Sequence, residues 1–172
     1  MNNVVLRNAS RLLLLILLQA MVLKRLVPDY GLFVYIHIII YPIFILLLPV
    51  KTPQALAVLL GFFLGLLVDI FYDSIGVHAS ACVFTAFIRP YVLNFMAPRT
   101  GYTVNQTPTR SAFGFNWFFG YSSFLLFAHL FFYFSVEAFT FVYIGDIFLR
   151  TFFSFVVSMF FVLAWQYIFD PK

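Results

Sequence analysis

The sequence predicts an all-α integral membrane protein that forms a compact bundle of about six transmembrane helices. Of its 172 residues, 64% are hydrophobic and only 9% are charged, whereas soluble proteins average about a quarter charged residues. The apolar residues gather in runs of roughly 20, the length that crosses a bilayer as a helix. Almost no soluble fold could bury this much apolar surface. We therefore expect a single transmembrane domain over residues 1–172.

Six apolar segments account for most of the chain, and charged residues and prolines mark several of their ends. Arg11 and Lys24 border the core of the first segment and can extend toward opposite interfaces. Pro53 suits the first turn of the third segment, because proline needs no backbone donor there. The predicted spans cover residues 8–27, 31–49, 53–72, 78–97, 115–135 and 146–168.

Prolines also fall inside two of these segments. Pro42 predicts a kink in the second segment, since proline removes a helical hydrogen bond. This segment is also short, so a broken or re-entrant helix is the alternative interpretation. Pro90 lies inside the fourth segment. Between the fifth and sixth segments, residues 137–144 are aromatic and give no clear turn before Gly145.

The distribution of Lys and Arg predicts the orientation, because cytoplasmic loops carry an excess of both. With six spans and a cytoplasmic amino terminus, most basic residues fall inside and most acids fall at or near the outside. The inside set is Arg7, Arg11, Lys51, Arg99, Arg110 and Lys172; the outside set is Lys24 and Arg25; the acids are Asp29, Asp69, Asp73, Glu137 and Asp146. We therefore expect both termini and the polar loop 98–114 to lie in the cytoplasm. The net charge of +4 then indicates topology, not nucleic-acid binding.

The third segment carries a stripe of small residues that ends in an acid. Ala57, Gly61 and Gly65 recur every four residues, and Asp69 continues the series. Such spacing places them on one helix face, where small residues let two backbones approach closely in lipid. A carboxylate at membrane depth costs roughly 2.5–3.5 kcal/mol, so Asp69 should face protein, water or headgroups. Generic helix packing with an Asp at the interface is the simpler alternative.

The fourth segment carries a polar stripe. His78, Cys82, Thr85 and Arg89 follow at spacings of four, three and four, which helical geometry places on one face. Arg89 then lies roughly 16 Å below His78 and needs a partner, a wet cavity or freed carbonyls. The alternative is that Arg89 extends to the cytoplasmic interface. We expect the two stripes to pack within the bundle and against a partner helix.

The sequence offers no strong catalytic, cofactor or metal signature, and we expect a protein that is not an enzyme and needs no cofactor. Cys82, His78 and Asp69 offer a thiol, an imidazole and a carboxylate, which are the groups of a catalytic site with a thiol nucleophile. The sequence alone does not show that they lie close together. His37 and His129 stand without a second ligand at metal spacing. Asp146 and Arg150 are four apart and predict an ion pair on one helix.

The run Gly61-Phe-Phe-Leu-Gly65-Leu-Leu-Val-Asp69, followed by Gly76-Val-His78-Ala, resembles the signature region of MreD, the rod shape-determining membrane protein of bacteria. Members show a glycine-rich third helix that ends in Asp, a short loop with Gly and a fourth helix that opens with His or a similar residue and small side chains. The motif covers about twenty residues, while length and span number fit over the whole chain. The high aromatic content and the long 98–114 loop depart from the family.

The resemblance implies a fold similar to the substrate-binding subunits of energy-coupling-factor transporters. It also implies a non-catalytic scaffold in the cell-elongation machinery, which acts in cell shape and lateral peptidoglycan synthesis. The expected partners are an MreC-like single-span periplasmic protein, MreB, RodA, a class B penicillin-binding protein and membrane lipid, without nucleic acid. The alternative is a subunit that binds a vitamin-type small molecule.

Overall fold

The computed structural model describes residues 11–24, 34–99, 101–103, 106–140 and 142–170, and over these residues the fold is all-helical, without strands. Three helices, α4 (Gln54–Tyr72), α7 (Phe115–Ala138) and α8 (Ile144–Phe169), are long and apolar enough to cross a membrane. The protein is therefore compatible with a membrane helical bundle. Residues 8–10, 25–27 and 31–33 of the predicted spans, with Arg7, Arg25, Asp29 and Lys172, lie outside the described residues.

The helices follow four of the predicted segments closely. A first helix, Arg11–Leu23, ends as the π-helix η1 (Leu18–Leu23). The other elements are α3 (Ile43–Leu46), α4 (Gln54–Tyr72), α5 (Val77–Phe95), α6 (Arg110–Phe113), α7 (Phe115–Ala138) and α8 (Ile144–Phe169). Gly76 and Gly114 precede α5 and α7 with φ of 92° and 86°, a region that glycine enters without steric cost. Asp73 ends α4 in the left-handed region, which Asp tolerates better than most residues.

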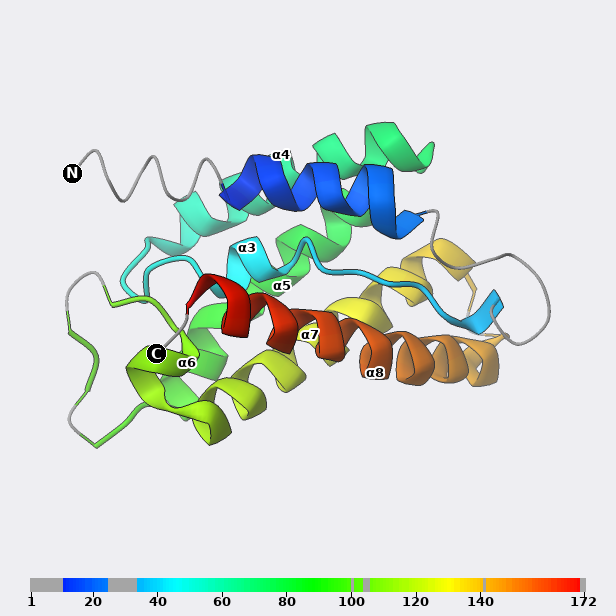
Figure 1. Ribbon diagram of the computed structural model, residues 1–172. Coiled ribbons are helices and arrows are strands. Elements are labelled where there is room, and N and C mark those ends of the chain that lie inside the picture. Colours follow the sequence, from blue (N-terminus) through cyan, green and yellow to red (C-terminus); the bar gives the residue numbers. More distant parts are fainter. Residues whose placement is uncertain (1–10, 25–33, 100, 104–105, 141, 171–172) are drawn as a thin grey trace.

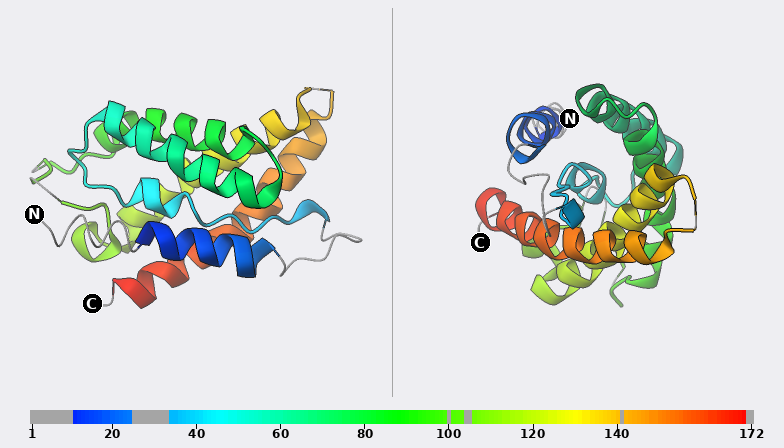
Figure 2. Two further views of the ribbon diagram at one scale, coloured as in Figure 1. Left: turned by 90° about the horizontal axis from the view of Figure 1, so that it is seen from above. Right: turned by 90° about the vertical axis from the view of Figure 1, so that its right-hand side faces the viewer.

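The prediction of one helix over residues 31–49 is wrong for its described part. Residues 36–40 are extended, and only the four residues of α3 form an α-helix after Pro42. The broken segment that sequence left as an alternative is what the structure contains. It runs through the centre of a ring of helices (Figure 2), and residues 38–48 are buried. Irregular backbone of this kind is tolerated at membrane depth where protein surrounds it.

Two antiparallel hairpins, α4 with α5 and α7 with α8, give the bundle two distinct ends (Figure 1). The α4–α5 and α7–α8 connections lie at one end, while α6 and the segments before α4 and after α5 lie at the other. The second end holds the described residues Arg11, Lys51, Arg99 and Arg110 together with Asp170, and the first end holds Asp69, Asp73, Glu137 and Asp146 together with Lys24 and Arg150. The two ends thus differ in charge.

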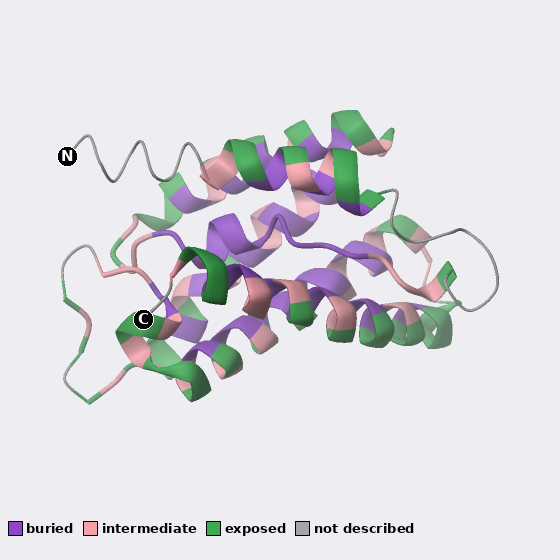
Figure 3. Cartoon of the chain, viewed as in Figure 1, coloured by how far each residue is buried: buried purple, intermediate pink, exposed green. Residues whose placement is uncertain are grey.

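Burial is arranged for an apolar environment (Figure 3). The outer faces of the long helices carry exposed large hydrophobic residues, such as Ile70 at 71% and Phe160 at 69% exposure. The interior, in contrast, contains fully buried polar side chains, among them His129, Ser154 and Ser158. Burying polar groups costs free energy unless each is hydrogen-bonded, so these groups must find partners inside the chain.

Candidate functional site

The small-residue stripe of α4 packs directly against α5 of the same chain. A Cβ atom built on Gly65 would lie 2.3 Å from Ala79 Cα, which no real contact allows. One turn away, a Cβ on Gly61 would lie 3.1 Å from the carbonyl oxygen of Cys82. Ala57 continues the same buried face. The two helix backbones therefore touch at Gly65, one turn before Asp69.

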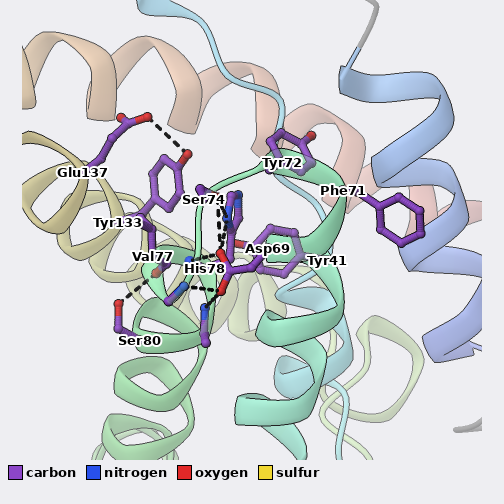
Figure 4. A network of polar contacts seen from close by, with 12 residues as sticks. Tyr41, Asp69, Phe71, Tyr72, Ser74, Val77, His78, Ser80, Tyr133 and Glu137 are labelled. Carbon is purple, nitrogen blue, oxygen red and sulfur yellow. Dashed lines mark hydrogen bonds and ion pairs between the residues drawn. The ribbon is translucent and has the colours of Figure 1, made fainter.

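This close approach brings the buried Asp69 carboxylate to the first turn of α5 (Figure 4). The backbone N–H groups of Gly76, His78 and Ala79 donate to its two oxygens at 2.9, 2.9 and 3.1 Å. His78 Nδ1 lies 2.9 Å from Oδ1, and Ser74 Oγ donates to the same oxygen at 3.3 Å. The carboxylate thus accepts hydrogen bonds from the α5 amino terminus and from two side chains.

The chemistry of a helix end explains this arrangement. The first amides of a helix have no partner within the helix, and the helix dipole favours an anion beside them. Gly76 occupies the position before α5, and glycine has no side chain to cap these amides. Asp69 supplies the missing acceptor from α4. The amides in return stabilise a carboxylate that burial would otherwise penalise.

Three tyrosine rings surround the His78 imidazole (Figure 4). Ring centroids lie 4.8 Å away for Tyr72 and Tyr133 and 5.6 Å away for Tyr41. The Tyr133 hydroxyl donates to Glu137 at 3.4 Å. His78 is therefore held by Asp69 on one side and packed by aromatic rings on others, and it is 1% exposed. Such packing fixes the imidazole in place.

Thr85 lies further along the same face of α5. It contacts His129, a histidine for which the sequence analysis found no partner. Thr85 Oγ1 donates its proton to Ala81 O at 2.8 Å, so it accepts from His129 Nδ1–H at 2.8 Å. Nε2 of His129 forms a second hydrogen bond, with the Tyr41 hydroxyl, at 2.9 Å. Because the one hydroxyl proton of Thr85 goes to Ala81 O, Nδ1 of His129 is the donor in the bond to Thr85. Tyr41 belongs to the central segment, so the network ties that segment to α5 and α7.

Arg89 is 2% exposed, so it does not extend to the molecular surface. Its guanidinium donates to Leu48 O, to Pro49 O at 3.3 Å and to the Tyr121 hydroxyl at 3.1 Å. Tyr121 in turn donates to Leu46 O at 2.9 Å. Leu46 is the last residue of α3, and Leu48 and Pro49 follow it. The carboxyl end of a helix attracts a cation. The sequence suggested freed carbonyls as one of several possible partners for Arg89, and the carbonyl acceptors of its guanidinium lie just beyond α3.

The residues that hold the extended segment were missed by the sequence analysis. Ser154 Oγ accepts from His37 N–H at 2.8 Å and donates to Tyr35 O at 3.2 Å. Ser158 Oγ accepts from Ile39 N–H at 2.9 Å and donates to His37 O at 3.3 Å. Four helical residues rise about 6 Å and two extended residues rise about 6.6 Å, so the two registers match. The two serine hydroxyls thus form the hydrogen bonds that a neighbouring strand would provide in a sheet.

Gln19 in η1 serves the opposite edge of the same segment. Its side-chain amide donates to Ile38 O at 2.8 Å and accepts from Ile40 N–H at 2.9 Å. Alternate residues of an extended chain direct their backbone groups to opposite edges, which explains why α8 and Gln19 contact alternate positions. Hydroxyl and amide residues inside strongly apolar segments, at Gln19, Ser154 and Ser158, were the available sequence signal.

The remaining predicted residues have varied surroundings. Cys82 is a buried free thiol on the α4–α5 contact. The predicted Asp146–Arg150 ion pair does not form; Arg150 pairs with Glu137 of α7 at 3.9 Å, because the two helices lie side by side at this end. His37 packs edge-on against Phe134 with ring centroids 5.3 Å apart. Within the described ranges, no group of three His, Cys, Asp or Glu residues is placed to hold a metal.

Outside the long helices, the 98–114 loop folds back onto the helix ends. The Tyr102 hydroxyl donates to Leu93 O at 2.7 Å, and burial raises the pKa of Tyr102 to about 12. Ser111 N–H donates to the Asp170 carboxylate at 3.2 Å. Burial alone would raise the pKa of Asp170, but hydrogen bonds from Ser111 and Thr109 and the Arg110 charge together lower it. Asn105 lies outside the described residues.

Taken together, the buried polar groups of this region hold the chain's own backbone. Asp69 binds the start of α5, Arg89 binds the end of α3, and the serines and Gln19 bind the extended segment. The cavity beside Tyr72, His37 and Lys24 has a volume of about 60 Å³, far below the range of small-molecule pockets. The arrangement is built for rigidity, and its chemistry is hydrogen bonding within the bundle.

Comparison with known proteins gave no match: no family model, no curated protein and no solved structure is similar to this chain.

Proposed function

We propose that this chain is a non-catalytic membrane scaffold of the bacterial cell-elongation machinery, which supports cell shape and lateral peptidoglycan synthesis by binding an MreC-like single-span protein. The observation that carries this proposal is that the buried polar side chains form their hydrogen bonds within the chain itself. Asp69, Thr85 and Arg89 all bond to backbone or side chains of the same chain. A rigid bundle with an apolar exterior suits helix docking better than turnover.

The geometry around Cys82 also favours a scaffold over an enzyme. A nucleophilic thiol needs a base within hydrogen-bond reach and access for a substrate. Cys82 is fully buried between α4 and α5. The Nδ1 atom of His78 is already engaged with Asp69 and Ser74. The three residue types that raised a catalytic interpretation thus have structural contacts.

The cavities favour the scaffold over a vitamin-binding subunit. Such a subunit would need an enclosed pocket with several convergent polar groups. The groove between α5 and α7 is larger, about 610 Å³, but aromatic and aliphatic residues line it. Such a groove suits an acyl chain or an apolar helix. The space at the centre of the bundle is filled by residues 36–48.

Co-purification from detergent tests the proposal. The tagged full chain is expressed with a single-span, coiled-coil periplasmic partner encoded beside it, and we expect the two to elute as one complex. Gly65→Leu should abolish this complex through loss of the bundle, which size-exclusion chromatography of the variant alone would reveal. Cells depleted of the chain should lose their rod shape. Thermal stabilisation by a vitamin, without partner binding, would contradict the proposal and support the transport subunit.

A further inference from the structure

We propose that the cavity between the end of α7 and the start of α8 binds the phosphoethanolamine headgroup of a membrane phospholipid. The cavity has a volume of about 300 Å³, at the lower limit for small-molecule sites. Its lining combines both signs of charge with an apolar wall: Phe134, Glu137, Ala138, Tyr143, Asp146, Ile147 and Arg150. This inference does not depend on the proposed scaffold function.

Arg150 supplies the group for the phosphate. Its Nη1 atom lies 3.9 Å from Glu137 Oε2, a long ion pair, and its side chain is 35% exposed. Among the described residues this is the one interaction that the guanidinium makes. Its remaining N–H groups form the planar fork that suits two phosphate oxygens.

Glu137 and Asp146 supply the groups for the ammonium. Glu137 Oε1 accepts a hydrogen bond of 3.4 Å from Tyr133 and Oε2 forms the long ion pair with Arg150, so neither oxygen has a short contact. The exposed Asp146 carboxylate forms no hydrogen bond or ion pair with the described residues. A primary ammonium donates hydrogen bonds to carboxylates, whereas the quaternary ammonium of choline has no donor. Two acids beside one base therefore match ethanolamine and repel a purely anionic headgroup.

The position of the cavity favours a lipid over a free small molecule. It opens where two helices that are long and apolar enough to cross a membrane meet their connecting loop. Phe134 and Ile147 at its wall are buried, and Phe148 and Phe152 continue α8 with 51% and 58% exposure. A headgroup in the cavity would thus leave its acyl chains against apolar surface.

Thermal unfolding of the purified full chain in detergent tests this inference. Short-chain phosphatidylethanolamine, phosphatidylcholine, phosphatidylglycerol and free phosphoethanolamine are added separately at equal concentration. We expect phosphatidylethanolamine to raise the melting temperature more than the other three. Arg150→Gln and Glu137→Gln should each weaken its apparent affinity about tenfold, because each removes a charged hydrogen-bond partner.

Two matched variants keep the test specific. Arg99→Gln removes one exposed positive charge at the opposite end, and Asp73→Asn removes one exposed acid outside the cavity. Both should retain the full effect. Equal stabilisation by phosphatidylcholine, preference for phosphatidylglycerol, or an undiminished effect in Arg150→Gln and Glu137→Gln would overturn the inference. An equal effect of free phosphoethanolamine would overturn the assignment to lipid.

Discussion

At the scale of single residues, Asp69 shows how a carboxylate that costs free energy to bury can stabilise the fold. Its carboxylate accepts hydrogen bonds from the backbone N–H groups of Gly76, His78 and Ala79 around the start of α5 and from two side chains. Each buried N–H that loses its acceptor costs about 1–3 kcal/mol. Asp69 therefore stabilises the fold mainly by accepting hydrogen bonds from donors that would otherwise be buried without a partner.

Substitution of Asp69 separates its hydrogen bonds from its charge. Asp69→Asn keeps one acceptor oxygen, while Asp69→Leu leaves all three amides unpaired. We expect both variants to melt below the wild type in detergent, with Asp69→Leu lower by several kcal/mol. Equal losses in the two variants would show that the charge beside the helix end dominates.

Ser158 allows a similar test on the central segment. Ser158→Ala leaves the Ile39 N–H without its acceptor, and we expect a loss of about 1–3 kcal/mol in unfolding free energy. Ser135→Ala is the matched control, because among the described residues the Ser135 hydroxyl bonds to the carbonyl four residues earlier in its own helix and not to the central segment. Equal stability of the two variants would contradict the role of Ser158 as a substitute strand edge.

At the scale of elements, the α4–α5 hairpin depends on backbone contact. A methyl group on Gly65 would collide with the Ala79 backbone at 2.3 Å, while one on Gly61 would meet Cys82 O at 3.1 Å. The Ala79 backbone cannot move without breaking its own hydrogen bond to Asp69. The hairpin and the carboxylate site are thus one unit.

A glycine series measures this contact. We expect Gly65→Ala to destabilise the chain by at least 1–3 kcal/mol, the usual range for overpacking, and Gly61→Ala to cost less. Gly120→Ala should be nearly neutral, because its new methyl group meets only the flexible end of Met96 at 3.2 Å. Thermal melts of the three variants in one detergent give the order. A neutral Gly65→Ala would contradict the close approach.

Part of this element structure was accessible from the sequence. The spacing of Gly61, Gly65 and Asp69 predicted a shared face and a carboxylate directed away from lipid. The spacing did not reveal which groups donate to the Asp69 carboxylate, because every residue except proline has a backbone amide and the sequence does not show which amides lie nearby. The extended course of residues 36–40 was also hidden, since an apolar run reads as a helix unless its distant hydrogen-bond partners, Gln19, Ser154 and Ser158, are known.

At the scale of the whole molecule, the two ends differ in net charge. Basic residues such as Lys51 and Arg99 predominate at one end, whereas at the other end four acids outnumber the two described bases, Lys24 and Arg150. This asymmetry agrees with the excess of positive charge in cytoplasmic loops. Number and direction of the spans remain predictions that labelling can check.

Cysteine labelling tests the orientation in intact cells. In a Cys82→Ser background, Arg99→Cys should react with a membrane-impermeant maleimide only after the membrane is opened. Val142→Cys, at the α7–α8 connection and 83% exposed, should react from outside. Reaction of both positions from the same side would contradict an odd number of crossings between them.

The most direct measurement of the central claim is amide hydrogen exchange of residues 74–80 in the wild type and in Asp69→Asn. If Asp69 holds the start of α5, these amides exchange slowly in the wild type and markedly faster in Asp69→Asn, while α7 and α8 stay unchanged. Identical exchange of residues 74–80 in the two proteins would show that the carboxylate does not support the helix.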